Sequence, residues 1–210
     1  MDIDGAPDPA DDARRDAGFL TVAEVLGLLP EVRVLDPGSV LIGADVALAA
    51  GTVLYPGTVL ETRAGGSITV GSGVRLGPGC VTVVATTARV TIGSGAELGP
   101  GPVTITATGS DVRVGDSARL SGGCLVEGPA VLGAGAQVLG AVAVRDAVLA
   151  AGGDHREADP DRRAGVVKGI GRVHGARVGV GEVVVGRGGV PSAPLVVERQ
   201  RAHHPQAPSR

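Results

Sequence analysis

Four histidines are the side chains of this sequence best suited to move a proton, because a neutral imidazole with its unperturbed pKa of about 6.5 acts as a general base near neutral pH. His155 stands out because it follows Asp154 in the longest polar segment, GGDHREADPDRRAG, which spans residues 152–165 and is called the polar loop below. His174 is the alternative base. The tail pair His203-His204 indicates a solvated segment.

Positive charge gathers in the same part of the chain. Residues 1–154 hold nine Lys and Arg against seventeen Asp and Glu, a net charge of −8, whereas residues 155–210 hold ten against five, a net charge of +5. Lys168, Arg162 and Arg163 are candidates for binding phosphates, since guanidinium groups pair with phosphate through two hydrogen bonds. The alternative is a solvated basic surface with no ligand.

The composition limits the fold that positions these residues. Among 210 residues there are 36 glycines and two aromatic residues, Phe19 and Tyr55, although 43% of the chain is hydrophobic. Aromatic side chains normally supply much of a core, so a narrow interior filled by Val, Leu, Ile and Ala is expected. No apolar run reaches the ~18 residues of a membrane span, and the acidic N-terminus lacks the pattern of a signal peptide. We therefore expect a cytoplasmic protein without membrane or nucleic-acid partners.

An internal repeat of 22 residues predicts the fold. Copies begin at Val46, Ile68, Val90 and Val112, and each contains a shorter unit of six, in which an aliphatic residue is usually followed by a small one. The leading positions are Ile42, Leu48, Leu54, Leu60, Val70, Leu76, Thr82, Ile92, Leu98, Thr104, Val114, Leu120, Val126, Leu132, Val138, Val144 and Ala150. A short flat strand followed by a glycine turn explains this spacing, and three such units close a triangular coil of about 18 residues. The pattern favours an all-β, left-handed parallel β-helix, with a right-handed β-helix as the alternative.

The four extra residues of each 22-residue copy predict a bulge at one corner. They lie around residues 60–69, 82–91 and 104–113, and the fourth copy lacks them. Cys80 and Cys124 are 44 residues apart, which places them two coils apart, with Cα atoms about 9–10 Å from each other. That distance exceeds the limit of about 7 Å for a disulfide, so we expect two reduced, buried cysteines and no metal site.

Four segments are expected along the chain. Residues 1–17 read as a disordered acidic N-terminus, and residues 18–31 as a helix that caps the first coil, with a capping box at Thr21 and Glu24. Residues 32–189 form the β-helix, interrupted by the polar loop. Residues 190–210 form a tail rich in Pro and Arg.

The hexad pattern resembles that of the hexapeptide-repeat acyltransferases, which have a left-handed β-helix. The similarity spans residues 40–189, and the stretch around Asp36-Pro37 looks most like the acetyltransferase domain of bacterial N-acetylglucosamine-1-phosphate uridyltransferases. The resemblance implies acetyl-CoA or another acyl-CoA as cosubstrate, no metal, and a homotrimer. It also implies a small polar acceptor, such as an amino sugar or a sugar nucleotide.

The resemblance also suggests roles for individual residues. In the family, a Val-Lys segment, an aliphatic-Gly turn and an Asn-His pair carry the catalytic residue; here Val144-Arg145, Leu149 to Gly153 and Asp154-His155 take their places. His155 would be the general base and Arg145 would bind an anionic group of the substrate. Asp154 or Asp159 would orient the imidazole, with Asp159 also near the substrate. Lys168, Arg162 and Arg163 would contact the phosphates of coenzyme A.

Two other functions stay open at this point. A non-catalytic β-helix would scaffold or regulate a partner through its corner bulges or its tail. A hexapeptide-repeat carbonic anhydrase would need three histidine ligands for its metal, but His155 and His174 are 19 residues apart and the coils contain no third histidine.

Overall fold

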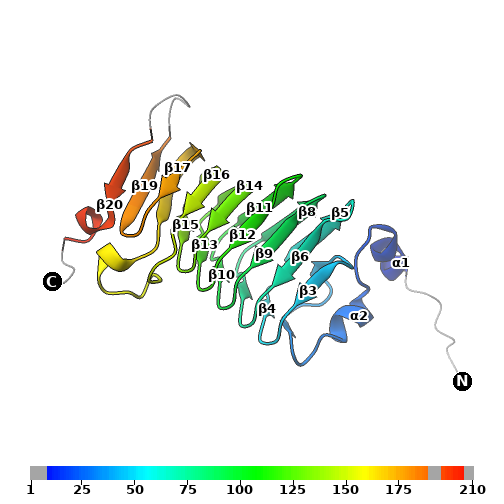
Figure 1. Ribbon diagram of the computed structural model, residues 1–210. Helices are drawn as coiled ribbons and strands as arrows, with labels where there is room; N and C mark the ends of the chain where they lie inside the picture. Colours follow the sequence, from blue (N-terminus) through cyan, green and yellow to red (C-terminus); the bar gives the residue numbers. More distant parts are fainter. Residues whose placement is uncertain (1–8, 189–194, 206–210) are drawn as a thin grey trace, which may run out of the picture.

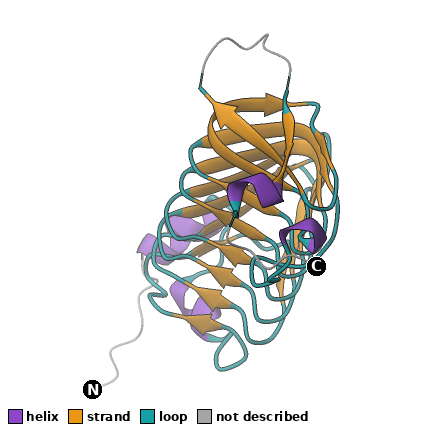
Figure 2. Ribbon diagram, turned by 90° about the vertical axis from the view of Figure 1, so that its left-hand side faces the viewer, coloured by secondary structure: helices purple, strands orange, loops and turns teal. Residues whose placement is uncertain are grey.

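A computed structural model describes residues 9–188 and 195–205. The chain winds as a left-handed parallel β-helix, as the hexad predicted, and its short strands stack along one axis (Figure 1). Seen from the end that carries the C-terminal segment, the strands form flat faces around a narrow interior (Figure 2). No helix in the described part of the chain is long and apolar enough to cross a membrane.

Three faces of hydrogen-bonded parallel strands make up the β-helix. The first face contains β1 (Arg33–Val34), β4 (Val53–Leu54), β7 (Arg75–Leu76), β10 (Glu97–Leu98), β13 (Arg119–Ser121), β15 (Gln137–Leu139), the start of β17 (Val166–His174), and β19 (Glu182–Arg187). The second contains β2 (Leu41–Ile42), β5 (Val59–Arg63), β8 (Val81–Thr86), β11 (Val103–Thr108), the start of β14 (Cys124–Leu132) and of β16 (Val142–Leu149), and the end of β17. The third contains β3 (Val46–Leu48), β6 (Ser67–Val70), β9 (Arg89–Ile92), β12 (Val112–Val114), the ends of β14 and β16, and β18 (Arg177–Val178).

The aliphatic residues of the hexad stack in vertical files inside the β-helix. Leu76, Leu98 and Leu120 pair in register on adjacent strands of the first face, and each is fully buried. Strands in register lie about 4.8 Å apart, so each leucine packs on the one below. This continuous file of branched aliphatics fills an interior too narrow for rings, which explains the scarcity of aromatic residues.

The predicted register is wrong on the second face for two positions. Val83 and Ile105 face the interior, fully buried and in register with Val126, whereas Thr82 and Thr104 are half-buried. The corners before β8 and β11 contain one residue more than the hexad allows. Because successive strand residues point to opposite faces, one extra residue moves the inward position by one.

Smaller departures occur at Leu48 and Ala150, which are both half-buried. Leu149 takes the interior position expected for Ala150, in register with Leu132. The cause is a shorter corner. The coil below has two corner residues, Gly128 and Pro129, whereas this coil has only Asp146, with φ of 48°.

The long corners are confirmed. Ala85 and Val90, and one coil later Ala107 and Val112, are buried where the second face turns into the third. In the fourth copy β14 passes this corner without extra residues. The four surplus residues therefore lengthen the strands on both sides of one corner and enlarge the core there.

Glycine after a leading aliphatic is needed for close approach between coils. A Cβ atom at Gly93 would lie 2.5 Å from the backbone nitrogen of Asp116 in the next coil. Real Cβ atoms do not come that close, so the corner accepts only glycine at this packing distance. The small residue of the hexad is therefore needed for the close stacking of backbones in successive coils, and not only for turns with positive φ.

The cysteine prediction is partly wrong. Both thiols are free, but Cys80 is exposed and only Cys124 is buried. Cys124 pairs in register with Val103, which pairs with Val81, so Cys80 lies one residue outside the equivalent position. The extra corner residue that shifts Val83 also moves Cys80 out to the surface.

Two helices cover the first coil. Helix α2 (Val22–Leu26) begins at the predicted capping box, in which the Thr21 side chain accepts from the Glu24 amide at 3.1 Å, and its Val25 is fully buried in the core. Residues 9–16, expected to be disordered, form helix α1 (Pro9–Asp16). The Arg14 guanidinium anchors this helix by donating to the carbonyls of Gly38 and Val40. Residues 1–8 lie outside the described part.

The C-terminal segment, residues 195–205, covers the opposite end. Strand β20 (Val197–Arg199) pairs antiparallel with β19 on the first face, and the 3-10 helix η2 (Gln200–His203) follows. The predicted tail is therefore structured over these residues, while 189–194 and 206–210 lie outside the described part. The composition suggested a solvated tail, but the C-terminal segment contains a buried residue, Gln200.

Candidate functional site

The polar loop leaves the β-helix between the third and the first face. Strand β16 ends at Leu149 and β17 begins at Val166. Gly153 closes the neck of the loop, because its amide donates to the Arg162 carbonyl at 2.8 Å and its carbonyl accepts from the Ala164 amide at 2.9 Å. The residues between them, including His155, are thus held as one compact excursion.

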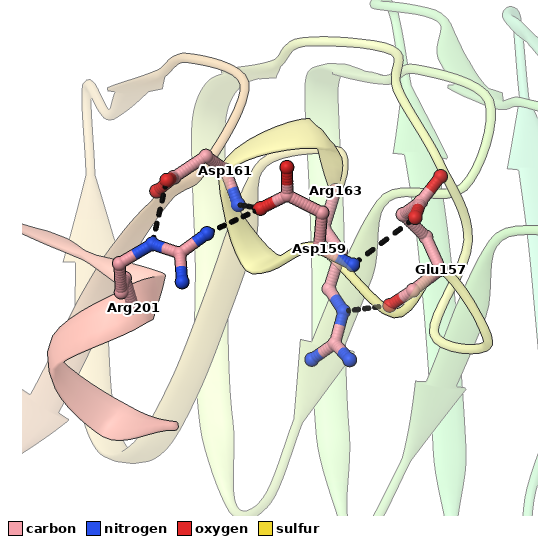
Figure 3. Close-up of polar contacts among 5 residues, drawn as sticks. All are labelled: Glu157, Asp159, Asp161, Arg163 and Arg201. Carbon is pink, nitrogen blue, oxygen red and sulfur yellow. Dashed lines mark hydrogen bonds and ion pairs between the residues drawn. The ribbon is translucent and has the colours of Figure 1, made fainter. Parts of the chain in front are cut away.

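Ion pairs fix this excursion at both ends. On one side, the Arg156 guanidinium lies 3.1 Å from the Glu97 carboxylate of β10 on the first face. On the other side, Arg201 of η2 binds both Asp159 and Asp161, with its Nε 2.6 Å from the Asp161 carboxylate (Figure 3). The polar loop and the C-terminal segment are therefore joined to each other above the first face.

Short contacts within the loop shape the 3-10 helix η1 (Pro160–Arg162). The Asp159 carboxylate caps it by accepting from the Asp161 amide at 3.1 Å, and the Arg163 Nε donates to the Glu157 carbonyl at 2.7 Å (Figure 3). Arg201 completes the cluster, and its guanidinium pKa is raised, first by the hydrogen bond to Asp161. Asp159 and Asp161 are thus part of the scaffold of the loop.

A groove of about 270 Å³ lies where the polar loop and the C-terminal segment meet the first face; we call it the C-terminal groove. Its floor consists of Arg119, Gln137, Val166 and Val183, which occupy consecutive strands in register. Leu139, Lys168, His155, Arg163, Gln200, His203 and His204 complete the lining. The groove thus takes side chains from five separate parts of the chain.

Two nitrogen atoms in this groove are buried without a hydrogen-bond partner. Within the described residues, His155 Nδ1 and Arg119 Nε are the only buried side-chain nitrogen or oxygen atoms in this condition. A buried polar atom without a partner costs free energy, and both such atoms lie on one groove. Both side chains border the groove, although these two atoms themselves lie beneath its surface.

The two tail histidines have different environments. His203 Nε2 lies 2.9 Å from the Glu198 carboxylate, which also binds Arg187. His204 Nε2 lies 3.2 Å from the Arg163 guanidinium. Burial lowers the pKa of His204, and the positive charges of Arg163 and Lys168 lower it further. The shift therefore reflects burial first and the neighbouring positive charges second.

The structure brings together three of the predicted site residues. His155, Arg163 and Lys168 all line the C-terminal groove. Arg162 is exposed beside it, in η1. The alternative base His174 lies exposed on the second face, at the end of β17.

Other predicted partners are elsewhere. Arg145 is exposed on the second face, in register with His174, because β16 reaches this face before the polar loop begins. Asp154 binds Arg156 and Asp159 binds Arg201, and the orientation of His155 by one of these carboxylates stays a prediction. No group of three or more His, Cys, Asp or Glu among residues 9–188 and 195–205 is arranged to hold a metal ion.

Sequence reasoning missed the residues that complete the groove. Arg119 and Gln137 occupy outward positions of ordinary hexads, and only their register with Val166 places them under the polar loop. His203 and His204 reach the groove because Gln200 docks η2, its Nε2 donating to the carbonyls of Ala164 at 2.7 Å and Glu182 at 3.0 Å. The basic character of the tail was the one signal for this docking.

Comparisons with known proteins show no family for this chain. No protein-family model matches the sequence, and no curated protein matches it. A hexapeptide transferase family protein from Anaplasma phagocytophilum shares 15% identity over 80% of this chain and 82% of that chain, with a TM-score of 0.31. AntD, an N-acyltransferase from Bacillus cereus solved with dTDP and 3-hydroxybutyryl-CoA, shares 14% identity over 90% of this chain and 93% of that chain, with a TM-score of 0.30. The narrower resemblance to the uridyltransferase domain stays a prediction.

Proposed function

We propose that the chain is an acyl-CoA-dependent acyltransferase that acts on the nitrogen or oxygen of a small polar acceptor. One observation carries this proposal: the His155 imidazole borders a basic groove. Because its Nδ1 is buried, Nε2 is the ring nitrogen that can take the proton of a bound nucleophile. The expected acceptors are an amino sugar or a sugar nucleotide, and the expected donor is acetyl-CoA.

The chemistry follows from general-base catalysis. When Nδ1 of His155 carries the hydrogen, Nε2 accepts the proton of the acceptor N–H or O–H while the acceptor atom bonds to the thioester carbonyl carbon. The carbon–sulfur bond then breaks, and coenzyme A leaves as a thiolate that takes the proton from His155. The positive charges of Arg119, Arg163 and Lys168 suit the anionic groups of donor and acceptor.

A homotrimer remains part of this proposal. The groove of about 270 Å³ is open and small compared with a complete coenzyme. A neighbouring β-helix packed on the first face would supply a second wall for the coenzyme, and Arg162 lies exposed at the edge of the groove to meet its phosphates. Cytoplasmic location stays a prediction.

The test is release of free thiol from acetyl-CoA in the presence of a panel of amino sugars and sugar nucleotides. We expect His155→Ala to lower the rate by about 10²–10⁴-fold, the usual contribution of a general base. His174→Ala is the matched control, because it removes an exposed imidazole from the second face. Full activity of His155→Ala would refute the assigned role. Absence of thiol release, together with an unchanged melting temperature in millimolar acetyl-CoA and coenzyme A, would favour the non-catalytic scaffold.

A further inference from the structure

The charge of the C-terminal groove is one-sided. Its lining includes three cationic side chains, Arg119, Arg163 and Lys168, and no Asp or Glu among the described residues. Three histidines add further donors. A groove with this lining repels cations and attracts anions.

Two of these cations have no anionic partner. Glu97 pairs in register with Arg119 on the first face, but its carboxylate is bound by Arg156 of the polar loop. Within residues 9–188 and 195–205, neither Arg119 nor Lys168 makes an ion pair or a side-chain hydrogen bond, and the Nε of Arg119 is buried. Both side chains are half-buried, and an oxyanion would pair with them through charge-assisted hydrogen bonds.

Arg163 differs from this pair because the protein holds it in place. Its Nε donates to the Glu157 carbonyl at 2.7 Å, and its terminal nitrogen lies 3.2 Å from His204. It therefore forms a fixed wall of the groove. Arg119 is in register with Val166, two residues before Lys168. The Cα atoms of Arg119 and Lys168 are therefore about 10 Å apart across the strands and about 7 Å apart along them, about 12 Å in all. That span lets two long side chains reach one anionic group above Gln137.

We infer that the C-terminal groove binds the acceptor through a carboxylate or phosphate oxyanion held by Arg119 and Lys168, next to the His155 imidazole. This inference rests on the proposed function and names the substrate class of that site as small anionic acceptors. The base and the unpartnered cations share one groove of about 270 Å³, which suits a small molecule and not a whole coenzyme. Lys168, which the family resemblance connects with coenzyme A, is thereby assigned to the acceptor.

The experiment measures binding by calorimetry, with inorganic phosphate, acetate and coenzyme A as probes. We expect phosphate or acetate to bind the protein alone, and coenzyme A to bind with unchanged affinity when that anion is saturating. Arg119→Gln and Lys168→Gln should each weaken binding of the small anion about tenfold or more. Arg113→Gln, which removes one exposed charge from the third face, is the matched control and should leave binding unchanged.

The outcomes separate the inference from the proposed function. Failure of both small anions to bind, or equal weakening by Arg113→Gln, overturns the inference. Competition between phosphate and coenzyme A, with Arg119→Gln weakening both, also overturns it, because the cations would then belong to the coenzyme. If the anion binds through Arg119 and Lys168 but no acceptor of any charge is acylated, the oxyanion site stands and the acyltransferase proposal fails.

Discussion

Removing the side-chain hydrogen bonds of Gln200 tests how the C-terminal groove is held together. Gln200 is 4% exposed, and its Nε2 bonds the carbonyls of Ala164 and Glu182. Gln200→Met keeps the length of the side chain but removes both bonds. At about 1 kcal/mol for each hydrogen bond, the free energy of opening the C-terminal segment falls by about 2 kcal/mol, which makes the equilibrium constant for local opening about 30-fold larger.

Hydrogen exchange of backbone amides measures this effect directly. We expect the amides of the β19–β20 ladder to exchange about 30-fold faster in Gln200→Met, whereas those of β10 in the middle of the β-helix stay unchanged, because each coil contacts only its neighbours. Arg199→Gln is the control: its ion pair with Glu182, at 3.9 Å and exposed, contributes little. Unchanged protection of the ladder in Gln200→Met, or equal loss in Arg199→Gln, would show that Gln200 does not dock the segment.

Three further outcomes follow from the core and from titratable groups. Leu98→Ala should lower the free energy of unfolding by about 2–5 kcal/mol in chemical denaturation, because Leu98 is fully buried in its file; a loss below 1 kcal/mol would contradict that packing. A thiol reagent should modify the exposed Cys80 quickly and Cys124 slowly, since burial raises the pKa of Cys124 to about 11; equal rates would disprove this. The pKa of His204 is lowered by burial and by a neighbouring guanidinium, so its stabilising contribution is present above the unfolded value of about 6.5 and lost as pH falls through the folded value. Titration by NMR would refute this if the folded pKa lies above 6.5.

The fold was predictable because the constraint on it is local and repeats. Each hexad places an aliphatic residue inside and a small residue at the corner, so Leu76, Leu98 and Leu120 could be aligned from spacing alone. The same reasoning failed at Val83 and Cys80, because one additional corner residue shifts the inward position without changing the 22-residue period. Errors of this kind are expected because the repeat period gives only the number of residues in a coil. Whether a residue is buried depends on which face of its strand the side chain occupies, and one extra residue changes that face.

The site was less predictable because its parts meet only after the coils stack. His155 and Lys168 were found from their types and neighbours, since the polar loop is visible as a break in the repeat. Arg119 is 36 residues before His155, and its hexad is ordinary. Only the register of β13, β15 and β17 reveals that it lies beneath the loop.

The two ends of the polar loop explain why a groove forms on this part of the first face and not elsewhere. Arg156 binds Glu97, the in-register neighbour of Arg119 on the first face, so this carboxylate is paired with the loop and not with Arg119. Arg201 binds Asp159 and thereby brings the C-terminal segment against the loop. The ion pairs that build the walls therefore also use up the nearby acids, and the cations that remain in the groove are left for a ligand.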